Sequence, residues 1–101
     1  MKFQFNGQDI QVDFQHGVEE HKKSHPRYTS CRISIGEMAF DGKLVFWGKR
    51  NFCRATGRRA SFLEAYDHMC DTLSLERDAR KQFGRAYWTA RQQQGGKHGM
   101  F

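Results

Sequence analysis

The segment KFQFNGQDIQVDF, residues 2–14, alternates apolar and polar side chains on both sides of a central Asn-Gly pair. This alternation is typical of β-strands, and Asn-Gly supplies the positive φ angles that a type I′ turn requires. A two-residue loop at Asn6-Gly7 would place Phe3 opposite Ile10. The segment therefore predicts a β-hairpin with one apolar face, made of Phe3, Phe5, Ile10 and Val12.

Further stretches continue the period of two. Residues 29–35 alternate in the same way and predict a half-buried strand that ends at Gly36. The segments EMAF and KLVFWG flank Asp41-Gly42, a second strong signal for a hairpin turn, and residues 50–56 predict one more strand before Gly57. Residues 15–26 have no apolar period and predict a loop. Because every connection but one is too short for a crossover, we expect an antiparallel β-meander of about four to six strands.

From Ser61 onward the apolar period changes to 3.6 residues, which predicts two helices. The first begins with Ser61 as N-cap, and Glu64 completes a capping box. Its apolar side contains Phe62, Leu63, Ala65, Tyr66, Met69, Cys70 and Leu73. The second runs from near Ser74 to about Gln92, with a buried stripe of Leu75, Ala79, Phe83, Ala86 and Ala90. The fold class expected is α+β, a β-meander followed by two C-terminal α-helices.

Length and composition indicate how many domains the chain forms and where the protein is located. Its 101 residues fit one domain, which we expect at residues 1–93, followed by a flexible C-terminal tail at residues 94–101. The sequence has no run of about 18 apolar residues and no signal-peptide core, so we expect no membrane association and a cytoplasmic location. The three cysteines are odd in number and widely spaced, so we expect them to be reduced.

The chain is strongly basic. Seventeen Lys and Arg against eleven Asp and Glu give a formal net charge of +6, which favours nucleic acid or an acidic protein surface as partner. No acidic residue lies between Asp41 and Glu64. That interval contains a cluster of cations, Lys43, Lys49, Arg50, Arg54, Arg58 and Arg59, interleaved with the aromatics Phe46, Trp47 and Phe52. We expect the aromatics to lie in the core and the cations to form a binding surface.

The second predicted helix adds another basic surface. At 100° per residue, one third of its circumference holds a set of residues that faces away from the apolar stripe. The set is Arg77, Arg80, Lys81, Gly84, Trp88 and Arg91. A glycine on such a face allows close approach of a phosphate, and Trp88 is a possible stacking platform. The alternative is an ordinary solvated face, with Trp88 packed against the first helix or against the arginine stems.

Motifs for catalysis and for cofactors are absent from the sequence, so we expect no enzyme activity, no cofactor and no metal. His16, His21, His25 and Cys31 supply only half of a zinc pattern, and a histidine-rich surface loop is the simpler interpretation. His68 and Cys70 lie about 200° apart on a helix and do not share an ion easily. No cysteine is marked out with a histidine as a nucleophilic pair.

Three functions remain open at this point. The first is nucleic-acid binding, mainly to the phosphate backbone, through a Lys/Arg-rich sheet edge and helix. The second is a small inhibitor or adaptor of the kind phages use, which docks on a larger enzyme or nucleic-acid-binding complex and blocks it. A minor third is an enzyme with an unrecognised Cys-His site. The sequence leaves the oligomeric state open.

Overall fold

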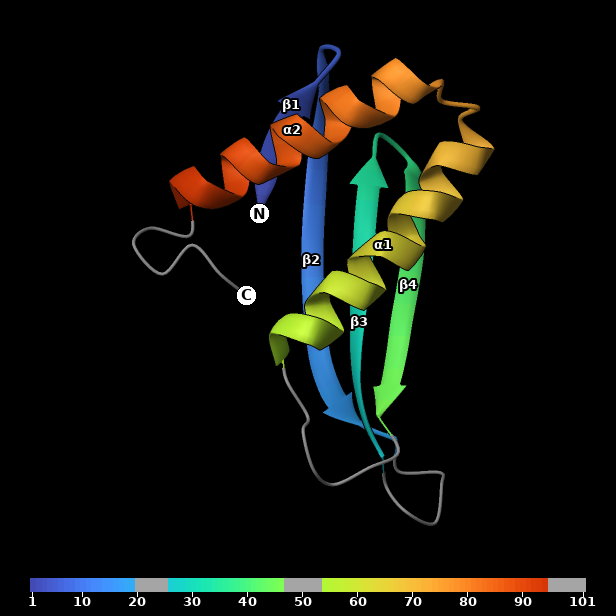
Figure 1. Cartoon of the computed structure of the whole chain (residues 1–101), viewed down its shortest axis with the longest axis vertical. Coiled ribbons are helices and arrows are strands. Elements are labelled where there is room, and N and C mark those ends of the chain that lie inside the picture. The colour runs from blue at the N-terminus through green and yellow to red at the C-terminus, as the bar shows by residue number, and fades with distance from the viewer. Residues whose placement is uncertain (20–25, 47–53, 95–101) are drawn as a thin grey trace.

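The fold is a four-stranded sheet with two helices on one of its faces, seen in a computed structural model that describes residues 1–19, 26–46 and 54–94 (Figure 1). In chain order the elements are β1 (Lys2–Phe5), β2 (Gln8–Val18), β3 (Arg27–Ile35), β4 (Met38–Phe46), α1 (Arg54–Thr72) and α2 (Arg77–Gln94). The sheet order is β1-β2-β3-β4 and every pairing is antiparallel. The prediction of an α+β fold, a β-meander followed by two C-terminal helices, is therefore confirmed.

The N-terminal hairpin has the predicted register. Phe5 pairs with Gln8 and Phe3 with Ile10. Asn6 and Gly7 have φ values of 52° and 75°, as a type I′ turn requires. Ile10 and Val12 are buried, and the two β1 phenylalanines pack against the same core. The local turn chemistry and the apolar alternation thus agree.

The second predicted hairpin, at Asp41-Gly42, is wrong. The turn lies earlier, at residues 36–37, where Ile35 pairs with Met38 and Gly36 has a φ of 58°. β4 runs without interruption through Asp41-Gly42, which pair with Arg32 and Cys31. Gly42 is needed for packing instead, because an added Cβ there would collide with the Ser61 carbonyl oxygen of α1.

Two other boundaries differ from the sequence predictions. β2 continues to Val18, so His16 and Gly17 belong to a strand and only the later part of the predicted loop falls outside β2. Residues 20–25 lie outside the described residues. The predicted strand at residues 50–56 is also wrong where the structure describes it, since Arg54–Thr56 form the first turn of α1.

Ser61 does not cap α1, because the helix begins seven residues earlier at Arg54. Ser61 is buried in the helix interior, and its hydroxyl donates to the Gly57 carbonyl oxygen at 2.7 Å. Serine can bond to the i−4 carbonyl as well as to an N-terminal amide, so the same side chain serves both contexts. Gly57 lets the first turns of α1 approach β3, since an added Cβ would lie 2.5 Å from Thr29 Oγ1.

Both helices cover the same face of the sheet and diverge from the turn that joins them (Figure 1). α1 packs along β3 and β4, and α2 packs across β1. The shared core includes Ile33, Phe62, Met69, Phe83 and Tyr87. Leu63 was expected on the apolar side of α1, but it is 46% exposed, whereas Tyr87 is buried although the predicted stripe did not include it.

Other expectations are tested only in part. Cys31 and Cys70 are buried free thiols, and Cys53 lies outside the described residues. α2 extends to Gln94, and the remainder of the expected tail, residues 95–101, also lies outside them. In the described part of the chain, neither helix is sufficiently long and apolar to span a bilayer.

Candidate nucleic-acid interface

The predicted basic residues do not all lie on one surface. Lys43 follows Gly42, whose backbone faces α1, so the Lys43 side chain points to the opposite face of the sheet. There it forms an ion pair with Glu19, and its ammonium lies 4.4 Å from the centroid of the Tyr28 ring. Lys43 therefore does not join a surface formed by the helices.

The face of the sheet away from the helices carries both positive and negative charge. The register places three cations, Lys2, Arg32 and Lys43, on it with three carboxylates, Asp9, Asp13 and Asp41, and the ion pair of Lys43 adds a fourth carboxylate, Glu19. Arg32 binds Asp41 through two hydrogen bonds of 2.7 and 3.1 Å, which lower the pKa of that carboxyl. This face has no excess of positive charge to attract a polyanion.

Arg58 is half-buried and holds α1 to the sheet. Its Nε donates to His16 Nε2 at 3.1 Å, and its guanidinium carbon lies 5.9 Å from the centroid of the Phe14 ring. Since His16 Nε2 accepts this bond, its Nδ1 carries the proton and donates to Thr29 Oγ1 at 3.0 Å. Arg58 thus packs over β2.

The remaining cations of the same cluster are only partly described. Arg59 is exposed on α1, and Arg54 is the first residue of that helix. Lys49 and Arg50 lie outside the described residues, as do the aromatics Trp47 and Phe52. The single surface expected from this cluster is therefore divided between the two faces of the sheet wherever the structure describes it.

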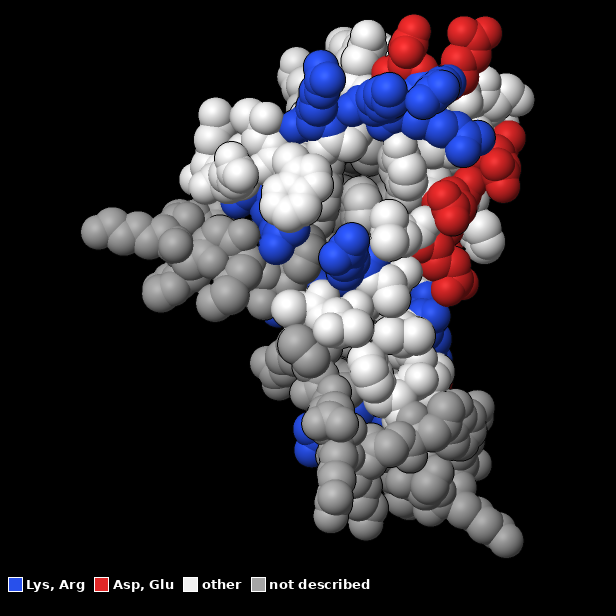
Figure 2. Space-filling view, in the orientation of Figure 1, with Lys and Arg blue, Asp and Glu red and all other residues white. Residues whose placement is uncertain are grey.

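α2 carries the clearest excess of positive charge. Its five cations are Arg77, Arg80, Lys81, Arg85 and Arg91, and its one carboxylate is Asp78. Figure 2 shows Lys and Arg side chains gathered over the first half of α2, with Asp and Glu side chains over the C-terminal half of α1. Positive charge thus gathers over the first half of α2, and negative charge over the C-terminal half of α1.

Three of the α2 cations form one line. Arg77, Lys81 and Arg85 are exposed and follow one another at intervals of four residues, so they extend over about 12 Å of one helix side. We call these three residues the α2 basic row. Arg85 was missing from the sequence prediction, although its spacing of four from Lys81 was the signal that would have found it.

Arg80 has a structural role. Its Nε donates to the Leu75 carbonyl oxygen at 2.9 Å, and one terminal nitrogen lies 3.6 Å from Asp71 Oδ1. The Arg80 carbonyl oxygen accepts a 2.6 Å hydrogen bond from the Tyr66 hydroxyl. These bonds stabilise the turn between α1 and α2. Arg80 therefore lies beside the basic row, but its side chain has a structural role.

Trp88 lies next to the basic row and is 53% exposed, so it does not belong to the core. The Arg91 guanidinium carbon lies 4.6 Å from the Trp88 ring centroid, a cation–π contact that agrees with the alternative of Trp88 packed against an arginine. Partial burial lowers the pKa of Arg91, and the positive charge of Arg58 lowers it further, against the opposing effect of Tyr87. Arginine nevertheless keeps its charge at neutral pH.

Aromatic packing fixes α2 on the sheet. The Phe83 ring makes edge contacts with Phe3 and Phe5, at centroid distances of 5.5 and 5.2 Å. The Tyr87 ring stacks on Phe62 of α1 at 4.1 Å. The aromatics of the described core therefore hold the helix in place and leave Trp88 outside.

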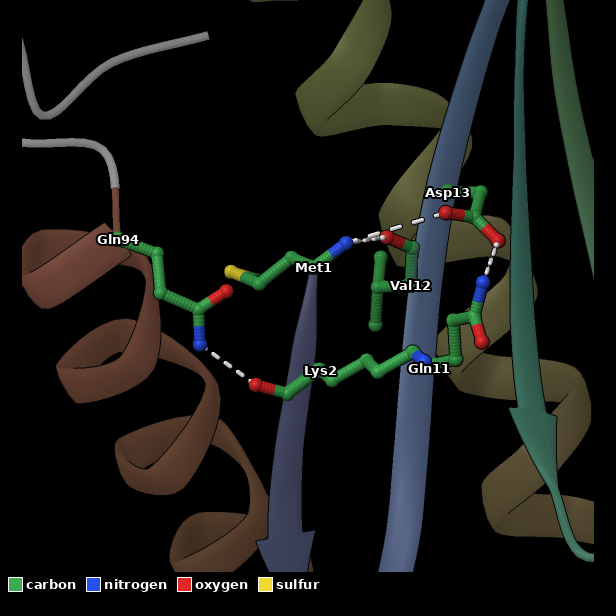
Figure 3. Close-up of polar contacts among 6 residues, drawn as sticks. All are labelled: Met1, Lys2, Gln11, Val12, Asp13 and Gln94. Carbon is green, nitrogen blue, oxygen red and sulfur yellow. Dashed lines mark hydrogen bonds and ion pairs between the residues drawn. The ribbon is translucent and has the colours of Figure 1, made fainter.

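Polar bonds add to this anchoring at the C-terminal end of α2 (Figure 3). Gln94 Nε2 donates to the Lys2 carbonyl oxygen at 2.5 Å. The Met1 amino group donates to the Val12 carbonyl oxygen at 2.9 Å and lies 3.8 Å from Asp13 Oδ1, which holds the start of β1 against β2. α2 is thus fastened to the N-terminal hairpin at both its aromatic side and its end.

The described residues contain no group of three His, Cys, Asp or Glu side chains that would hold a metal ion. Of the zinc pattern weighed from the sequence, His16 uses its two ring nitrogens for Thr29 and Arg58, and His21 and His25 lie outside the described residues. Burial raises the pKa of Cys31 to about 12 and raises that of Cys70, so both thiols stay protonated and are poor nucleophiles.

Comparison with known proteins adds no assignment, since no family model, no curated protein and no solved structure matches this chain.

Proposed function

We propose that this protein binds nucleic acid through the outward side of α2, mainly by contacts to the phosphate backbone, and that it catalyses no reaction. The α2 basic row carries this proposal, because Arg77, Lys81 and Arg85 are all exposed along one line of a helix. Exposed cations in such a line neutralise successive phosphates and release condensed counterions. Such contacts position a protein on nucleic acid but carry little sequence information.

The distribution of charge supports the choice of α2 over the sheet. The open sheet face pairs its cations with carboxylates, as Arg32 does with Asp41. α2, by contrast, has five cations and one carboxylate, Asp78. Arg59 of α1 is a further exposed cation, and a contribution from Lys49, Arg50 and Arg54 stays a prediction.

A salt titration tests this proposal. The binding constant for a fluorescein-labelled oligonucleotide should fall linearly with salt on a logarithmic plot, with a slope of about 0.7–0.9 per phosphate neutralised. Binding that is absent at low salt, or that does not respond to salt, would refute the proposal.

A second candidate, an inhibitor or adaptor that docks on a larger protein, is favoured by the outer edge of β4. β4 is at one end of the sheet order, and among the described residues no strand pairs with its outer edge. Glu64 of α1 lies over Gly42 of this strand, and Asp71 follows two turns later. An open edge beside carboxylates suits an extended basic segment of a partner protein.

A pull-down from lysate, with and without nuclease, separates the two candidates. A nucleic-acid-binding protein should lose its co-purifying material after nuclease treatment. A protein-directed inhibitor should retain one polypeptide at the same yield and should not bind free oligonucleotide.

A further inference from the structure

Trp88 is the one large apolar side chain on α2 that is strongly exposed. Its exposed fraction is 53%, whereas the neighbouring aromatics Phe83 and Tyr87 are almost completely buried. Placing that much aromatic surface in water is unfavourable, and the fold gains little from it. The exposed part of the ring is therefore accessible to a ligand.

The surroundings of Trp88 are cationic. Arg91, three residues later, places its guanidinium over the ring at 4.6 Å, and Arg85 of the basic row lies three residues earlier. The cation–π contact holds the ring in one orientation and adds positive charge beside it. An ordered aromatic ring among cations matches the face of a nucleobase attached to a phosphate backbone.

A residue without a side chain, Gly84, lies between the row and the ring. Gly84 lies one turn before Trp88, and an added Cβ at this position would meet no atom within 4 Å. At Gly84 itself, therefore, no side chain stands between the α2 basic row and the Trp88 ring.

We infer that Trp88 is a base-stacking platform and that the ligand of the α2 surface is a single strand, whose unpaired bases are free to stack on the ring. This inference rests on the proposed function, because it names the kind of nucleic acid that the same surface takes. In a duplex the base faces are already stacked on one another, so only the phosphates would reach α2.

The test compares three labelled probes of the same length in nucleotides per strand: oligo(dT), an abasic strand, and the dT·dA duplex. Anisotropy titrations use the full chain, Trp88→Ala and Trp88→Phe. For oligo(dT) we expect Trp88→Ala to weaken binding about 5- to 140-fold, the range that corresponds to about 1–3 kcal/mol per stacked base. Trp88→Phe should retain most of the affinity, and oligo(rU) distinguishes RNA from DNA as the source of the strand.

For the abasic strand and the duplex, Trp88→Ala should bind as the parent does. The matched control is Leu63→Ala, which removes a similarly exposed apolar side chain from α1 and should change none of the affinities. Equal loss on all three probes, or no loss on oligo(dT), overturns the stacking role. If the parent chain binds all three probes equally and with steep salt dependence, the phosphate-binding function stands and the preference for single strands falls. If it binds none of them, both proposals fall.

Discussion

Gly42 of β4 lies directly beneath the carbonyl oxygen of Ser61 in α1, so close that no side chain fits between the strand and the helix. A Cβ added to Gly42 would also lie 2.6 Å from the backbone nitrogen of Ala65. Glycine at this position therefore sets the distance between α1 and the sheet. That distance in turn lets Met69 and Cys70 of α1 be completely buried.

Gly42→Ala should lower the free energy of unfolding by about 1–3 kcal/mol or more, because the new methyl group meets helix backbone that has no rotamer to change. The matched control is Gly84→Ala in α2, where an added Cβ meets nothing and the helix should gain up to about 1 kcal/mol. Urea unfolding of the two variants and the parent measures both effects. A Gly42→Ala variant as stable as the parent would show that α1 does not lie this close.

Replacing Asn6-Gly7 by Ala-Ala should lower the free energy of unfolding by roughly 1 kcal/mol or more. Both residues have positive φ, 52° and 75°, and alanine resists that conformation. Thermal melts of the variant and the parent check the effect. An unchanged midpoint would contradict the type I′ turn.

Gly7 and Gly42 show which features of the fold can be predicted from the sequence and which cannot. The turn at Asn6-Gly7 depends on local φ preferences and on alternation over a few residues, so it was predictable with its register. Asp41-Gly42 gives the same local signal, but its glycine serves a contact with Ser61, nineteen residues later. A short window of sequence contains no signal for a contact between distant segments of the chain.

The candidate site was likewise predictable only in part from the sequence. Helical periodicity placed Trp88 on the outward side of α2 and Phe83 on the inward side, and the structure agrees. The density of cations between Asp41 and Glu64 did not reveal that Lys43 and Arg58 lie on opposite sides of the sheet. Their separation depends on the strand continuing through residue 42, which the sequence did not indicate.

Phe83→Ala should destabilise the protein by about 3–5 kcal/mol, because its ring is fully buried against Phe3 and Phe5. Trp88→Ala, five residues further along the same helix, should leave the unfolding midpoint nearly unchanged. Circular dichroism melts of the two variants provide the comparison. A large loss of stability in Trp88→Ala would place that ring in the fold and remove it from the binding surface.

The protein should lose stability as the pH rises from about 9 towards 12. Burial raises the pKa of Cys31 from 9.0 to about 12, with smaller contributions from Asp13 and Asp41, and burial likewise raises the pKa of Tyr66 from 10.0 to about 12. In that window the unfolded chain has released protons that the folded chain still holds, so the free energy of unfolding falls with pH.

Urea midpoints measured across this pH window check the effect, and Cys31→Ala supplies the control, since it removes the thiol and should reduce the dependence to the part that Tyr66 contributes. A stability that stays constant from pH 9 to pH 12 would contradict the burial of these groups.

The central claim is that α2, rather than the net charge of the chain, binds the phosphate backbone. Two double variants test it most directly, because each removes two positive charges: Lys81→Gln with Arg85→Gln on α2, and Lys2→Gln with Arg32→Gln on the open face of the sheet. Salt-dependent anisotropy titrations with oligo(dT) compare both with the parent, after melts have shown that each is folded. We expect the α2 pair to weaken binding and to reduce the salt slope by about 0.7 for each lost contact, while the sheet pair binds as the parent does. Equal weakening by the two pairs, or no weakening by the α2 pair, would contradict the account.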